Sequence, residues 1–134
     1  MRITEFRYFF GSYFWGYQKY QIRRCVDNSV VFTARGRNGV ELSVHKSISA
    51  EALELLGHVI DRLNIWAWNS FHASDDMVED GYSFELQVVY ENESSINASG
   101  YELYPKDYNQ GHRGLICLLN RFLEWEVSDG YESG

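Results

Sequence analysis

The most charged short segment of the chain is residues 72–81, in which a histidine precedes four closely spaced carboxylates. These residues are His72, Asp75, Asp76, Glu79 and Asp80. Imidazole and carboxylate groups are common metal ligands, so a metal-dependent hydrolase is one interpretation of this segment. However, the spacing fits neither the calcium-loop pattern nor the H-E-x-x-H zinc pattern. We therefore interpret the segment as a solvated acidic loop, whose carboxylates can pair with lysine or arginine side chains of a partner.

A second candidate recognition segment surrounds the single proline of the chain, Pro105. It contains Tyr101, Tyr104 and Tyr108, interspersed with acidic residues. Aromatic rings flanked by carboxylates suit arginine-rich surfaces, through cation–π contacts and ion pairs. The alternative interpretation is that the tyrosines anchor a long connection over the sheet edge. From the two segments we select a predicted partner-binding set of Asp75, Asp76, Glu79, Asp80, Tyr104, Asp107 and Tyr108.

The remaining nucleophiles and bases form no catalytic pattern along the sequence. The other histidines are His45, His58 and His112, and none has a spacing that identifies a nucleophile, a base and an orienting group. The two cysteines, Cys25 and Cys117, stand outside any C-x-x-C pair, and we expect packed, unpaired thiols. Both glycine-rich phosphate-binding motifs are absent. We therefore predict no catalytic residue, no cofactor site and no metal site.

Composition indicates a folded chain of ordinary size. Its 134 residues are 45% hydrophobic, which predicts a single domain over 1–134 that buries its own core. Residues 128–134 are expected to form a frayed tail. The N-terminal residues lack a signal-peptide pattern and no apolar run reaches membrane-spanning length, so we expect a cytoplasmic protein without a membrane partner.

Charge is distributed unevenly along the chain, whose net charge is −7. Residues 1–63 carry nine basic and six acidic side chains, whereas residues 64–134 carry three basic and thirteen acidic ones. An acidic surface of this kind favours a basic protein partner and disfavours nucleic acid. The alternative is that the acidic residues serve solubility alone.

Hydrophobic periodicity predicts an α+β fold in the order ββββ-α-ββ-α. Alternating apolar residues predict an antiparallel sheet of about six strands, joined by short turns. Apolar residues at helical spacing predict two helices that pack on one face of that sheet. The expected strands cover 2–10, 17–26, 30–36, 40–46, 82–90 and 95–101, and the expected helices cover 50–63 and 111–126. Exposed strand edges can recruit a second chain, so either a monomer or a homodimer is expected.

The hairpin formed by the third and fourth strands allows two registers. A two-residue loop would place arginines on the apolar face, whereas a three-residue loop pairs Ala34 with Leu42 and Arg35 with Glu41. Because register follows the buried face, we predict the three-residue loop, with Gly39 in a left-handed bulge position.

The stretch DGYSFELQVVY, followed by SGYELYPKDY and an apolar helix, resembles a pattern in small bacterial proteins of unassigned function. It covers about residues 80–124 and implies no catalytic residue. In size, acidity and lack of catalytic motifs, the chain also resembles the immunity proteins of bacterial toxin systems. That resemblance implies a cytosolic inhibitor that binds a basic toxin domain, such as a nuclease. An alternative is a small-ligand module with a pocket between the sheet and the aromatic segment 66–71.

Overall fold

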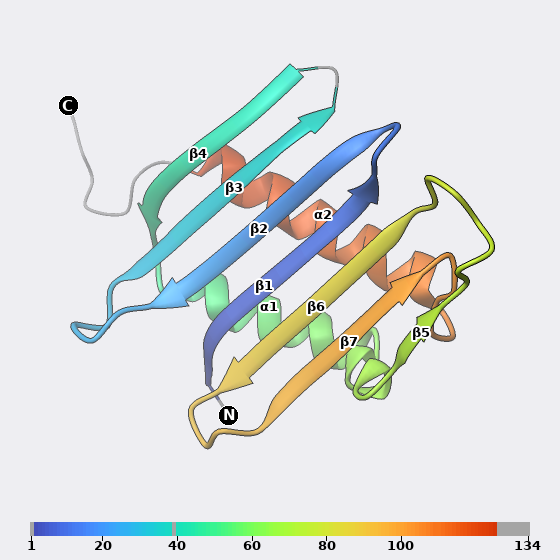
Figure 1. Cartoon of the computed structure of the whole chain (residues 1–134). Helices are drawn as coiled ribbons and strands as arrows, with labels where there is room; N and C mark the ends of the chain where they lie inside the picture. The colour runs from blue at the N-terminus through green and yellow to red at the C-terminus, as the bar shows by residue number, and fades with distance from the viewer. Residues whose placement is uncertain (1, 39, 126–134) are drawn as a thin grey trace.

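The computed structural model describes residues 2–38 and 40–125. Their elements are β1 (Ile3–Ser12), β2 (Gly16–Arg24), β3 (Val30–Asn38), β4 (Val40–Ile48), α1 (Glu51–Arg62), the 3₁₀ helix η1 (Ile65–Trp68), β5 (His72–Ser74), β6 (Ser83–Tyr90), β7 (Ser95–Tyr101) and α2 (Tyr108–Glu124). Figure 1 shows one twisted sheet with the two α-helices behind it. The frayed tail predicted over 128–134 lies outside the described residues.

The strands form a mixed seven-stranded sheet in the order β4-β3-β2-β1-β6-β7-β5. The α+β class is confirmed, but the expected antiparallel sheet of about six strands needs correction. Residues 72–74, which we assigned to a polar loop, form a short strand at the edge that runs parallel to β7. Just before this strand, the N–H of Ser70 donates a hydrogen bond to the carbonyl of Asn97 at 2.8 Å. Three residues are too few to show the alternation from which strands are predicted.

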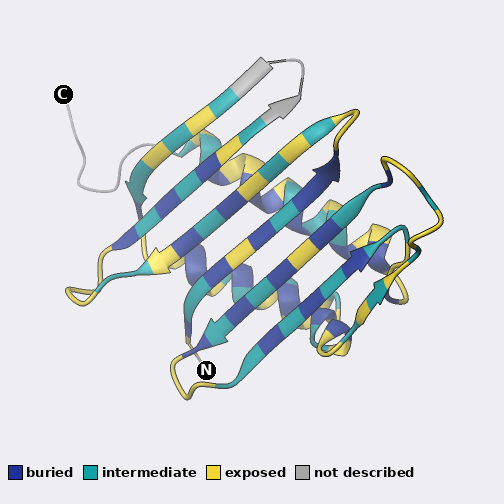
Figure 2. Cartoon of the chain, viewed as in Figure 1, coloured by how far each residue is buried: buried dark blue, intermediate teal, exposed yellow. Residues whose placement is uncertain are grey.

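Both helices cover one face of the sheet, as predicted (Figure 1). Buried residues alternate with more exposed ones along the strands (Figure 2). The buried strand residues form one core with those of the two helices. Phe6, Tyr8 and Phe10 carry this pattern in β1. Helix α1 begins just after Ser49, whose hydroxyl accepts a hydrogen bond from the N–H of Glu51 at 3.2 Å. No helix among the described residues combines the length and the apolar character needed to cross a membrane.

Helix α2 begins at Tyr108, three residues before the predicted start. The N–H of Tyr108 donates to the carbonyl of Pro105 at 3.2 Å, and the N–H of Gly111 donates to the carbonyl of Asp107 at 3.2 Å. The helix packs closely at this point, because a Cβ on Gly111 would lie 2.4 Å from Cζ2 of Trp68. A side chain at position 111 would therefore separate the helix from the core.

The β3–β4 hairpin has the predicted apolar face but a different register. Ala34 pairs with Val44 instead of Leu42, and Arg35 pairs with Ser43 instead of Glu41. A shift of two residues leaves every side chain on its original face, so the apolar pattern alone could not distinguish the two registers. Gly39, which we placed in a bulge, lies outside the described residues.

The two thiols are unpaired, as predicted, but one of them is not packed. Cys25 is half-buried, whereas Cys117 is exposed on α2. Position 117 lies on the outer side of the helix, between Ile116 and the buried Leu118. An apolar neighbourhood in the sequence does not fix which side of a helix a residue occupies.

Candidate functional site

Three segments far apart in the sequence meet at one end of the sheet. Gly11 pairs with Ser83, and Ser83 pairs with Tyr101. The end of β1, the start of β6 and the end of β7 therefore lie side by side. The β1–β2 turn, the β5–β6 loop and the β7–α2 connection therefore project from the same end (Figure 1). We call the surface formed by residues 13–15, 75–82 and 102–107 the aromatic–acidic end.

The β1–β2 turn displays three consecutive aromatic side chains to solvent. Tyr13 and Phe14 are each 81% exposed, and Trp15 is 78% exposed. Our predicted partner-binding set omitted these residues, which lie between the strands expected over 2–10 and 17–26. Large aromatic side chains exposed together are unusual on a protein surface and are typical of interaction sites.

The turn that carries these aromatics is braced by a side-chain hydrogen bond and by a close backbone approach. The Ser12 side chain is only 2% exposed, and its hydroxyl accepts a hydrogen bond from the N–H of Trp15 at 3.0 Å. Gly11 has φ of +137°, and a Cβ there would lie 2.2 Å from the carbonyl oxygen of Gly16. A turn braced by these contacts would lose less backbone entropy on binding a partner than an unbraced one.

The β5–β6 loop is fastened to the end of β7. The Tyr101 hydroxyl donates to the carbonyl of Val78 at 2.8 Å and accepts from the N–H of Gly81 at 2.7 Å. The Glu102 carboxylate accepts from the N–H of Tyr82 at 2.6 Å. Tyr101 therefore anchors the acidic loop, which agrees with our alternative interpretation of the tyrosine-rich segment.

The four predicted loop carboxylates lie together in this loop. Asp76, Glu79 and Asp80 are exposed, while Asp75 is half-buried. Two of them also shape the loop: Asp75 accepts from the N–H of Met77 at 3.2 Å, and Asp76 accepts from the Ser74 hydroxyl at 2.6 Å. Both keep an oxygen available for a partner cation.

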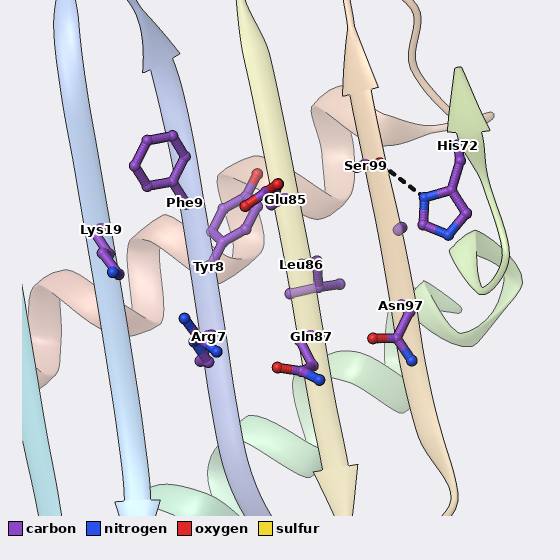
Figure 3. A pocket seen from close by; sticks show the side chains of 11 residues that line it. Arg7, Tyr8, Phe9, Lys19, His72, Glu85, Leu86, Gln87, Asn97 and Ser99 are labelled. Atoms are coloured by element: carbon purple, nitrogen blue, oxygen red, sulfur yellow. Dashed lines mark hydrogen bonds between the residues drawn. The ribbon is translucent and has the colours of Figure 1, made fainter. Parts of the chain in front are cut away.

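His72 faces the sheet surface, and its imidazole contacts β7. Its Nδ1 lies 2.8 Å from the Ser99 hydroxyl, as the dashed line in Figure 3 marks. Among residues 2–38 and 40–125, no three His, Cys, Asp or Glu side chains are grouped so that they could hold a metal ion. The geometry therefore adds nothing to the metal-dependent interpretation of this segment.

The other three predicted residues occupy different environments. Tyr104 is 37% exposed, and burial together with the nearby Glu102 carboxylate raises its pKa to about 12. Asp107 is exposed immediately before α2. Tyr108 is only 5% exposed and belongs to the core, where its ring lies 5.2 Å from that of Trp68. The four loop carboxylates, Tyr104 and Asp107 thus lie on two segments that leave the same end of the sheet, whereas Tyr108 is buried with its ring 5.0 Å from that of Tyr104.

The interior below Tyr104 holds a polar network that the sequence did not reveal. The Tyr8 hydroxyl lies 2.6 Å from the Tyr108 hydroxyl and 2.7 Å from Nδ1 of His112. One consistent assignment has Tyr108 donating to Tyr8, and Tyr8 donating to a neutral His112. Burial raises the pKa of both tyrosines and lowers that of His112. Tyr8 and His112 are more than a hundred positions apart, so no local pattern connects them.

This network predicts that the fold loses stability in mild acid. His112 has a folded-state pKa below its unfolded value of 6.5, so its neutral form is the one the fold favours. Its contribution is complete above about pH 6.5 and declines as the pH falls below that value. Between about pH 8 and pH 5, the free energy of unfolding measured in urea should fall more steeply for wild type than for His112→Gln. His58→Gln, at an exposed site on α1, is the control and should behave as wild type. If the free energy of unfolding depended on pH equally in the two variants, the prediction would be contradicted.

A second prediction concerns the anchor of the acidic loop. Tyr101→Phe removes both hydrogen bonds made by the hydroxyl and should cost about 1–2 kcal/mol of stability. Amide hydrogen exchange should accelerate over 75–82 and remain unchanged in β1. Tyr13→Phe is the matched control, because Tyr13 is 81% exposed. Unchanged exchange in Tyr101→Phe would show that the loop is held by other contacts.

The aromatic segment 66–71, beside which we expected a pocket, packs closely against the sheet and α2. Trp68 is 2% exposed, its ring lies 6.1 Å from Phe84, and Trp66 stacks on Tyr90 at 4.9 Å. Helix α2 closes the remaining space through Gly111. A small-ligand site at this position is therefore not favoured.

No protein-family model matches the chain, and no curated protein matches it. The likeness to immunity proteins therefore stays a prediction. The surface itself carries the chemistry that bears on function. At the aromatic–acidic end, that chemistry is a set of exposed rings beside the carboxylates of Asp75, Asp76, Glu79, Asp80, Glu102 and Asp107.

Proposed function

We propose that this chain is a non-catalytic binding protein whose aromatic–acidic end docks onto a basic protein. The observation that carries the proposal is the braced turn that exposes Tyr13, Phe14 and Trp15. Tyrosine and tryptophan are the side chains most enriched among residues that dominate protein–protein binding energy. Met77, which is 91% exposed in the neighbouring loop, extends the apolar centre of this surface.

The charge around these side chains defines the kind of partner. Six carboxylates and one ammonium group, that of Lys106, lie on the two segments beside the turn. A surface of this sign attracts a positively charged protein over long range and accelerates the encounter at low salt. The partner therefore carries arginine and lysine side chains around an apolar recess that accepts the turn.

Within this class, we propose an immunity-type inhibitor of a basic toxin domain as the most specific function. A nuclease domain is a suitable target, because a site that holds phosphate groups is positively charged. An acidic protein is attracted to that positively charged site, and its aromatic turn can fill the substrate cleft. Binding of this kind requires no catalytic group on the inhibitor.

The proposal is tested by affinity capture from the source organism, in low and moderate salt. We expect one stoichiometric basic partner whose recovery falls as salt rises. A triple variant, Asp76→Asn with Glu79→Gln and Asp80→Asn, removes three exposed charges while keeping the loop's hydrogen-bond acceptors. It should slow association about tenfold or more at low salt.

The control for this experiment is Glu91→Gln with Glu93→Gln, in the exposed β6–β7 turn at the opposite end of the sheet. It changes charge without touching the proposed surface, so association should stay near the wild-type rate. Equal association rates for the triple variant and this control would refute the acidic loop as the docking surface.

A further inference from the structure

The face of the sheet opposite the helices carries a basic basin on β2, β3 and β4. The basin is an open hollow with a volume of about 280 Å³. Its lining residues are Lys19, Gln21, Arg23, Val31, Thr33, Arg35 and His45, with no carboxylate among them. On a protein of net charge −7, such a local concentration of cations is not explained by solubility.

Two of these cations face each other directly. Lys19 pairs with Arg35 across the β2–β3 ladder, and like charges in such positions destabilise a sheet. Neither forms an ion pair with another described residue. Glu5, the β1 neighbour of Arg23, accepts a hydrogen bond from Gln21 at 3.1 Å. A bound anion would relieve the repulsion between Lys19 and Arg35.

Polar groups in the basin are positioned to complete an anion site. The Thr33 hydroxyl lies 3.1 Å from Nδ1 of His45, which orients the imidazole and leaves its Nε2 available. Gln21 lies between Lys19 and Arg23 on β2, and its amide, which donates one N–H to Glu5, keeps a second N–H for the anion. Guanidinium, ammonium and imidazole groups together are typical of sites that bind phosphoryl groups.

A second groove, of about 370 Å³, shares Lys19 with the basin. Figure 3 shows the side chains that line this second groove. Gln87 and Asn97 supply amide groups there, and Glu85 supplies a carboxylate. The Phe9 ring lines this groove and stacks on Tyr17 with a centroid distance of 5.3 Å. The groove therefore offers an aromatic surface, amides that can pair with a base, and a carboxylate that can accept hydrogen bonds from ribose hydroxyls.

We infer that the open face of the sheet binds a free nucleotide, with its phosphate over Lys19 and Arg35 and its base beside Phe9. The two grooves together have the volume of a typical small-ligand site. The ligand is small and not a nucleic acid strand, because a longer polyanion would be repelled by the protein's net negative charge. This site is separate from the aromatic–acidic end and does not depend on the proposed partner.

Isothermal titration with inorganic phosphate, the four nucleosides and their monophosphates tests the inference. At least one monophosphate should bind more tightly than phosphate or its own nucleoside. Lys19→Gln with Arg35→Gln should weaken that binding about tenfold or more. Arg113→Gln with Arg121→Gln, on exposed positions of α2, is the matched control and should leave it unchanged.

Phe9→Leu tests the base-binding part of the site independently of the phosphate-binding part. It should weaken monophosphate binding while leaving phosphate binding unchanged, because the ring contacts only the base. Absence of binding by every monophosphate, or equal binding by the Lys19/Arg35 variant and wild type, would overturn the inference. Tighter binding of a single-stranded oligonucleotide than of any monophosphate would overturn the assignment to a free nucleotide.

Discussion

Replacing Gly11 with alanine is expected to cost about 3 kcal/mol or more of the free energy of unfolding. The residue has φ of +137°, which side chains rarely tolerate, and its Cβ would lie 2.2 Å from a backbone oxygen. That oxygen belongs to Gly16, in the β2 strand that pairs with β1, so relief requires the hairpin itself to move. Urea unfolding followed by circular dichroism measures the change.

Gly57→Ala is the matched control for this substitution. Gly57 lies within α1, and the nearest atom to its added Cβ is Cδ1 of Ile3, at an ordinary contact distance of 3.9 Å. The control should be neutral or more stable by about 0.5–1 kcal/mol, because alanine is the better helix former. Equal effects of the two substitutions would mean that the β1–β2 turn is not constrained as described.

Removal of the exposed aromatic side chains is the second substitution with a large expected effect. Trp15→Ala with Phe14→Ala should weaken binding to the captured partner by about a hundredfold or more, since each buried aromatic anchor contributes about 2 kcal/mol or more. The fold should keep its stability, because both side chains are about 80% exposed. Biolayer interferometry should assign most of the loss to faster dissociation.

Val26→Ala is the control for the aromatic variant. Val26 is fully exposed in the β2–β3 turn, at the opposite end of the sheet, so its truncation should leave partner binding unchanged. Wild-type affinity in the aromatic variant would exclude the β1–β2 turn from the interface. Equal loss of affinity in both variants would show that the effect is not specific to the β1–β2 turn.

The fold class follows from local patterns, because apolar and polar residues alternate along each long strand and each helix carries an apolar stripe. Strand β6, for example, buries Phe84, Leu86 and Val88 on one face, as its alternation predicts. The parallel β5 strand escaped prediction because it is three residues long and its position depends on a distant strand, β7. The β3–β4 register escaped it because a shift of two residues preserves the buried face.

The candidate site was only partly accessible from the sequence. The acidic loop is visible as a charge run, but its fastening by Tyr101 depends on a contact between separate elements. The sequence did not show that Tyr108 is buried whereas Tyr104 is exposed. Both lie in one tyrosine-rich segment, and only the path of the chain decides which of them points into the core. The Tyr8–His112 contact joins the first strand to the last helix and is set by topology alone.

Hydroxyl-radical footprinting of the protein alone and in complex with its captured partner tests the proposed docking surface most directly. We expect strong protection of Tyr13, Phe14, Trp15 and Met77, all of which are highly exposed in the free protein. Val26, at the far end of the sheet, should remain as reactive as in the free protein. Protection of Val26 with no change at the β1–β2 turn would contradict the assignment of the aromatic–acidic end as the binding surface.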